Sequence, residues 1–125
     1  MAAPNIVNVT TIYGRTTGKA LTSSSQDILV NAASSNKVLK INSIIVSNVD
    51  GSNPDDVTVG FYDHDNGTAT FHLAKGVTVP LQSTLVVLGK DAPIYLEESD
   101  KITASGVAAN GDLEIIVSYE ELDDA

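Results

Sequence analysis

The chain has 125 residues, enough for one domain with a buried core, and carries a formal net charge of −9. It contains no cysteine and no tryptophan, which excludes disulfide frameworks, thiolate metal sites and cysteine nucleophiles. Phosphate backbones and anionic bilayers repel so acidic a chain, so we expect neither nucleic acid nor a membrane as a partner.

Strand-forming residues dominate the composition. The chain has 14 Val, 10 Ile and 11 Thr, whose branched side chains favour extended backbone. Apolar and polar residues alternate in segments such as 57–63 and 112–120, which is typical of strands that are packed on one face. The longest apolar run is only four residues, 85–88, whereas a membrane-spanning helix needs about 20. The start of the chain also lacks the pattern of a secretory signal.

The pattern predicts a series of short strands in chain order. We place them at residues 6–13, 27–32, 37–49, 56–63, 69–74, 77–80, 84–89, 93–97, 101–107 and 112–120. Turn signals recur at intervals of about 8 to 12 residues, as in sandwiches and barrels. The predicted fold is therefore an all-β, single-domain β-sandwich, jelly-roll-like, with about eight antiparallel strands.

Local signals refine this prediction. The apolar phase of the 37–49 segment changes near Asn42-Ser43, which indicates a bend or bulge. Asn66-Gly67 predicts a type I′ hairpin turn, and Lys75-Gly76 and Asn110-Gly111-Asp112 predict further turns. Proline cannot donate to a strand ladder, so we expect the prolines at 80 and 93 to lie at strand ends or edges.

The N-terminal part differs from the rest in polarity and charge. We expect residues 1–25 to form an N-terminal strand or arm with a flexible loop, because residues 14–26 are polar, and residues 26–125 to form the sandwich domain. Residues 1–49 hold four basic groups and one acid, and residues 50–125 hold three basic groups and fifteen acids. An extended arm could dock on an acidic neighbouring copy. We favour the alternative that both parts fold into one sheet system, because terminal strands usually pair within their own domain.

The two histidines are candidates for metal binding or base catalysis. His64 lies between two aspartates, but successive strand residues point to opposite faces, so we expect a solvated turn. His72 is expected to be a surface strand residue. The sequence leaves open whether a cation binds near Asp50, Asp55 and Asp56, whose spacing does not match the EF-hand pattern. We predict no metal site and no cofactor.

Catalytic motifs are missing from the sequence. It contains no nucleophile elbow, phosphate loop or dinucleotide-binding glycine motif, so we expect no catalytic residues and no enzyme activity. Aromatic platforms on sandwiches stack sugars, so a glycan-binding module on a tail or cell surface is the alternative function. Its candidates are the four tyrosines, which we expect instead to cap the core: Tyr13, Tyr62, Tyr95 and Tyr119.

A family resemblance covers roughly residues 44–121. It rests on the segments 44–51, 56–59, 71–74, 79–88, 93–100 and 112–121, and the opening residues 1–6 are also similar. Together these segments resemble small structural proteins of tailed phages of marine bacteria, including cyanophages. The resemblance implies a non-catalytic virion component, such as a head decoration or tail accessory protein, that is oligomeric and binds other coat subunits.

We therefore expect a virion structural protein, assembled in the host cytoplasm, that decorates or cements the capsid. Its expected partners are other virion proteins, above all the major capsid protein, and further copies of itself, with a trimer favoured. The predicted contact residues are apolar and lie near the chain end: Ile6, Val7, Val9 and Ile12.

Overall fold

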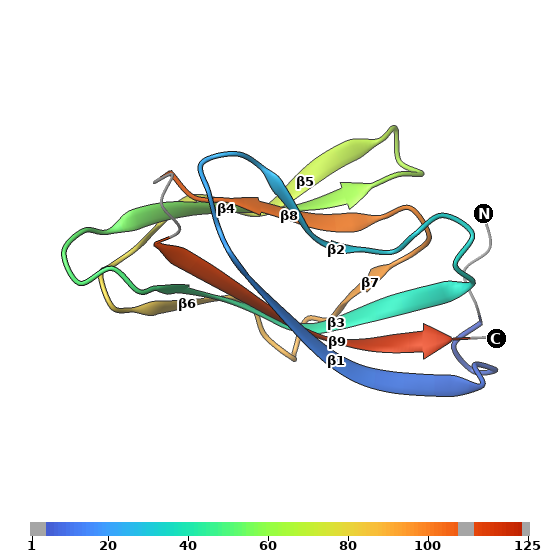
Figure 1. Ribbon diagram of the computed structural model, residues 1–125. Coiled ribbons are helices and arrows are strands. Elements are labelled where there is room, and N and C mark those ends of the chain that lie inside the picture. Colours follow the sequence, from blue (N-terminus) through green and yellow to red (C-terminus); the bar gives the residue numbers. More distant parts are fainter. Residues whose placement is uncertain (1–4, 108–111, 124–125) are drawn as a thin grey trace.

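The computed structural model describes residues 5–107 and 112–123, which form two facing antiparallel sheets (Figure 1). These residues contain nine strands and no helix, and so no helix with the length and apolar character of a membrane span. The strands are β1 (Thr11–Ala20), β2 (Gln26–Val30), β3 (Lys37–Asn48), β4 (Asp55–Asp63), β5 (Ala69–Val79), β6 (Thr84–Leu88), β7 (Ile94–Leu96), β8 (Lys101–Ser105) and β9 (Leu113–Asp123).

The strand order is that of a jelly roll. Sheet A has the order β1-β9-β3-β6, with β7 also paired to β3, and sheet B has the order β2-β8-β4-β5. Strands β6 and β7 pair with different parts of β3, so they act as two halves of one interrupted strand. The first strand then pairs with the last, the second with the next to last, and so on inward. This confirms the predicted jelly-roll-like sandwich, and the interruption raises the expected eight strands to nine.

The core lies between the sheets and follows the period-two alternation. Val57 and Val59 on β4 are fully buried, as are Ile115 and Val117 on β9. Strand β3 departs from strict alternation because it has a bulge. Its pairing with β9 shifts between Ile41 and Ser43, as the change of apolar phase predicts. The extra residue lets Ile41 and Ile44 both face the core with no exposed surface.

The β4–β5 hairpin differs from the predicted two-residue turn. Asp63 pairs with Ala69, which leaves a loop of residues 64–68. The Asn66 N–H donates to the Asp63 carbonyl at 3.4 Å, so a first turn is completed before Gly67. Positive φ angles then occur at Gly67 (72°) and Thr68 (52°) rather than at Asn66 and Gly67. The hairpin is confirmed, but the type I′ turn is wrong.

Strand β5 is continuous where two strands, 69–74 and 77–80, are predicted. Val77 pairs with Val57 and Ala74 with Val59, so Lys75-Gly76 forms a bulge instead of a turn. Gly76 has a φ of 61°, which glycine adopts without strain, and its N–H donates to Thr58 Oγ1 at 3.0 Å. The prolines at 80 and 93 flank β5 and β7 as expected. The predicted turn at 110–112 lies largely outside the described residues.

The expected loop over residues 14–26 is wrong for its first half. Residues 14–20 belong to β1, which pairs with β9 of the same chain along its whole length. The strand predicted at 6–13 begins only at Thr11, and the segment before it turns through an Asn8 N–H to Asn5 carbonyl bond of 2.9 Å. The physical reason is that β1 is an edge strand exposed on both faces, so it needs no apolar alternation.

Candidate functional site

The outer edge of β1 is the first candidate site. Strand β1 pairs with β9 on one side, and the described residues place no strand on its other side. Of its ten residues only Thr11 and Thr17 are partly buried, and the rest are exposed. In Figure 1, β1 runs along the free margin of sheet A. An edge of this kind offers a row of backbone donors and acceptors to another chain.

The hydrogen-bond phase of β1 shows which backbone groups are offered. The Leu21 N–H donates to the Leu113 carbonyl at 2.8 Å, directly after the paired segment. Because antiparallel pairs alternate, the odd-numbered residues of β1 bond to β9. On the far side of β9, a bond of 2.9 Å from the Val49 N–H to the Asp112 carbonyl fits the same alternation. The residues whose backbone groups point outward are Ile12, Gly14, Thr16, Gly18 and Ala20.

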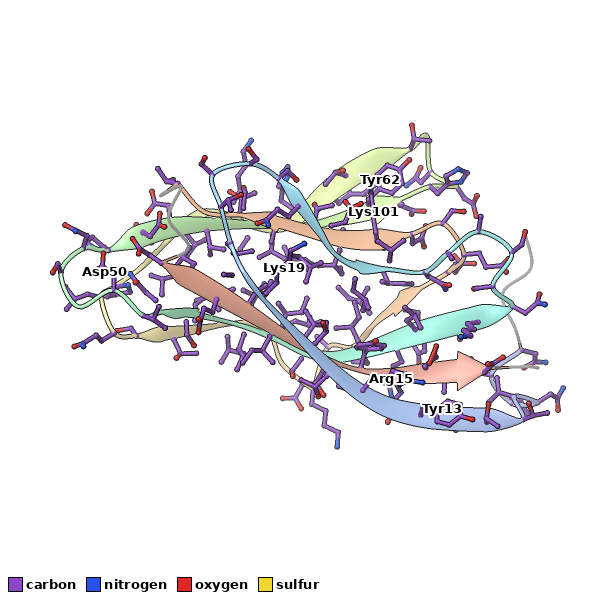
Figure 2. The ribbon with its side chains drawn as sticks, viewed as in Figure 1. Tyr13, Arg15, Lys19, Asp50, Tyr62 and Lys101 are labelled. Carbon is purple, nitrogen blue, oxygen red and sulfur yellow. The ribbon has the colours of Figure 1, made fainter. Side chains whose placement is uncertain are left out.

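Charged side chains fasten β1 to the sheet without occupying its open edge. Arg15 Nε donates to Glu121 Oε2 at 2.6 Å, and Lys37 Nζ donates to Glu121 Oε1 at 2.8 Å. These two bonds hold the pKa of Glu121 below its usual range, and the bond from Lys37 has the larger effect. Burial acts in the opposite direction but is outweighed. The Arg15 guanidinium also lies 5.3 Å from the centre of the Tyr13 ring, and Figure 2 shows both residues along β1.

The predicted contact residues lie at the start of this edge strand. Ile6, Val7 and Ile12 are 50%, 84% and 61% exposed, whereas Val9 is partly buried. The Thr10 N–H donates to the Asp123 carbonyl at 3.0 Å, which fixes the segment beside the end of β9. We call the exposed Ile6, Val7 and Ile12 the N-terminal apolar patch. The structure therefore joins an apolar patch to an unpaired strand edge.

A hollow of about 530 Å³ on the outer face of sheet B is the second candidate site. Its floor is Gly60, where an added Cβ would lie 2.7 Å from Thr70 Cγ2 and 3.1 Å from Thr103 Oγ1. The absent side chain thus opens the space between the neighbouring strands. Tyr62 and His72 also line the hollow.

Lys101 organises one side of this hollow. Its Nζ lies 3.1 Å from Asp27 Oδ1 and 5.1 Å from the centre of the Tyr62 ring. Figure 2 shows Tyr62 and Lys101 close together on sheet B. His64 meets the Tyr62 ring edge-on, with centroids 6.5 Å apart. The lining offers hydroxyls, the Tyr62 ring, the His72 imidazole and an ion pair, which together suit a neutral polar ligand.

The two histidines do not form a shared site with each other: His64 lies in a loop and His72 lies on a strand. His64 lies in the β4–β5 loop, with Nδ1 3.4 Å from Asp65 Oδ1 and a half-exposed ring, in agreement with the predicted turn. His72 lies on β5, as predicted. Among the described residues, no group of three or more His, Asp or Glu side chains is arranged to hold a metal ion.

The acids at the suggested cation site instead bind nearby backbone or hydroxyl groups. Asp50 Oδ1 accepts a hydrogen bond from the Ser52 N–H, and Asp55 Oδ1 accepts one from the Val107 N–H. Asp56 Oδ1 accepts a bond from the Thr78 hydroxyl. Each of these three carboxylates therefore accepts a hydrogen bond from within the chain.

The four tyrosines do not form one platform. Tyr13 on β1 and Tyr95 on β7 are exposed, Tyr62 lines the hollow, and Tyr119 packs against the core. The expected core-capping role fits Tyr119 best. Sequence reasoning missed the hollow, because Thr58, Gly60 and Tyr62 on β4 supply only part of its lining and the other lining residues come from other segments of the chain.

Neither a family model nor a curated protein matches the sequence. The fold is similar to a subunit of Bacillus endospore appendages, which form a family of disulfide-linked pili. That match has 14% identity and a TM-score of 0.53, and it covers 92% of this chain and 88% of the other. A CBM22 xylan-binding domain from Paenibacillus barcinonensis matches at 13% identity, over 91% and 86% of the two chains, with a TM-score of only 0.28. The pilus subunit therefore supports the sandwich fold, and this chain has no cysteine with which to share its linkage.

Proposed function

We propose that the chain is a non-catalytic structural subunit of a phage virion that decorates or cements the capsid by binding coat proteins. The observation that carries the proposal is the N-terminal apolar patch beside the open edge of β1. Ile6 and Val7 expose 50% and 84% of their surface, although burying such side chains is favourable by about 1.5 to 3 kcal/mol each. A coat protein that covers the patch would gain this free energy.

Three further observations support a structural role. The chain segments over 44–121 resemble virion structural proteins, as described above. A sandwich of this kind also builds an assembled pilus in the Bacillus appendages, so the fold is compatible with a subunit that is repeated many times. The acidic surface of the chain limits non-specific association and leaves specific contact to apolar surfaces.

The test is co-sedimentation of the purified chain with capsids of the parent phage. We expect the wild type to bind in a saturable number of copies per particle. The Ile6→Ser/Val7→Ser double variant should bind at least about tenfold more weakly, which corresponds to 1.4 kcal/mol. Val86→Ser is the matched control, because Val86 is 62% exposed on β6, away from the patch. Absence of wild-type binding, or equal binding of the double variant, would contradict the proposal.

Glycan binding in the sheet B hollow is a second candidate function. The favouring observation is the combination of hydroxyl groups and the Tyr62 ring around the Gly60 floor. Sugars offer hydroxyls to such groups and an apolar face to an aromatic ring. Screening on a glycan array should then give retention that Tyr62→Ala removes and Tyr95→Ala, on an exposed tyrosine outside the hollow, preserves. No retention of the wild type on the array would count against this function.

A further inference from the structure

We propose that β1 pairs antiparallel with β1 of a second copy, about a two-fold axis at Thr16, so that the two A sheets become one continuous sheet. The proposal deepens the structural role above and rests on it for its biological meaning. It names a second copy as the occupant of the open edge. The hydrogen-bond phase of β1, its charged residues and the side chains that would face each other all bear on this pairing.

The hydrogen-bond phase limits the possible registers. The backbone groups of even-numbered residues of β1 point away from β9, so outward groups of one copy must meet outward groups of the other. An axis at Thr16 pairs Thr16 with its own copy, Gly14 with Gly18, and Ile12 with Ala20. Nine residues of each strand, 12–20, then take part.

Other registers also pair the even-numbered residues of the two copies, but the two nearest ones bring positively charged side chains together. An axis at Arg15 places two arginines directly opposite each other. An axis at Thr17 places Arg15 opposite Lys19. Like charges directly opposite each other destabilise a strand pair. Axes at Gly14 or Gly18 avoid these pairs, but they shorten the overlap of the strands to residues 11–17 or 16–20. The Thr16 axis is thus the register with long overlap and no cation pair.

The side chains are complementary in this register. Tyr13 lies opposite Lys19 of the other copy, and a lysine ammonium over a tyrosine ring is attractive. Arg15 lies opposite Thr17, and the two Thr16 side chains face each other at the axis, a pairing that strands favour. Gly14 and Gly18 face each other without side chains, and an added Cβ at Gly14 would meet nothing within 4 Å. Around Thr16 only Gly14 and Gly18 repeat the same residue type, so the register is supported by the pairing of unlike side chains.

The charge of β1 differs in sign from that of the whole chain. The whole chain carries −9, but β1 holds Arg15 and Lys19 and no acid. In the dimer, the basic residues of the two β1 strands lie between the two β9 strands, each of which carries Glu114, Glu120, Glu121 and Asp123. The pairing is isologous and closes after two subunits. It predicts a dimer in place of the trimer expected from the family resemblance.

Single-cysteine variants test the pairing. The chain has no cysteine, so any disulfide joins two molecules. Residues that face each other in a hydrogen-bonded pair have Cα atoms about 5.5 Å apart, within the disulfide range of about 4.4 to 6.8 Å. Under mild oxidation Thr16→Cys should form a covalent dimer, and Arg15→Cys and Thr17→Cys should do so roughly tenfold more slowly, because their copies are offset along the strand.

Circular dichroism of the reduced variants establishes that each is folded. Equal cross-linking at all three positions, or none at Thr16→Cys, would overturn the proposal, and a maximum at position 15 or 17 would overturn the register. Capsid co-sedimentation is a separate readout. Capsid binding without cross-linking at Thr16→Cys would contradict the pairing of β1 with β1 but not the proposed structural role.

Discussion

Asn48 at the end of β3 is tied to Val79 at the end of β5, so that one buried amide joins sheet A to sheet B. Its Nδ2 donates to the Val79 carbonyl and to the Asn53 carbonyl, both at 3.0 Å, and its Oδ1 accepts from the Asp50 N–H at 2.9 Å. Asn48 is only 2% exposed. The side chain therefore satisfies backbone groups that water does not easily reach.

Asn48→Ala should lower the free energy of unfolding by about 3 kcal/mol, because it leaves buried backbone groups without partners. Urea denaturation followed by circular dichroism measures the change. Asn66→Ala, on an exposed residue of the β4–β5 loop, is the control and should change stability by less than about 0.5 kcal/mol. A similar loss in both variants would show that the Asn48 amide has no special role.

Glu121 should make the free energy of unfolding depend on pH in the acidic range. Its pKa is lowered in the folded chain by the hydrogen bonds from Lys37 and Arg15, so its contribution is present above its ordinary pKa of 4.5. That contribution is lost as the pH falls through the lower folded value. Glu121→Gln should thus lower the urea midpoint at neutral pH and flatten its fall below pH 4.5. An unchanged pH profile in the variant would contradict the ion-pair network.

Gly60→Ala should destabilise the chain by about 1 to 3 kcal/mol, because the new methyl group would lie 2.7 Å from Thr70 Cγ2. Thr70→Ser removes that methyl group and should restore part of the loss when the two changes are combined. Thermal unfolding of the two single variants and the double variant gives the interaction free energy between positions 60 and 70. Strict additivity would mean that Thr70 does not close the hollow around Gly60.

Proline substitutions test the assigned phase of β1. The Thr16 N–H points away from β9, so in solutions dilute enough to keep both proteins monomeric Thr16→Pro should cost less than about 1 kcal/mol, as edge strands tolerate proline there. The Thr17 N–H is assigned to the ladder with Val117, so Thr17→Pro should cost about 1 to 3 kcal/mol. The urea midpoints of the two variants show which substitution is the more destabilising. The reverse order would mean that the phase is shifted by one residue.

The sandwich and much of its detail could be predicted from sequence because they depend on local patterns. Val57 and Val59 alternate with polar neighbours, and this period two places them in the core. The phase change near Asn42 predicted the bulge that turns both Ile41 and Ile44 inward.

Strand β1 and the hollow could not be predicted in the same way. The sequence of β1, with Gly14, Gly18 and three threonines, carries no alternation, since both of its faces are exposed. Only its pairing with a distant strand defines it. The hollow combines residues from several strands, and the space depends on what an absent Gly60 side chain would touch. Such relationships come from topology and not from any segment of the chain.

The solution mass of the wild type, measured by light scattering after gel filtration, tests most directly whether β1 is an assembly edge. The account predicts a dimer of twice the 13.1 kDa chain mass, and a monomer for a folded Thr16→Pro variant, which lacks the N–H at the axis. A wild type that remains at 13.1 kDa at the highest concentration measured would contradict the account.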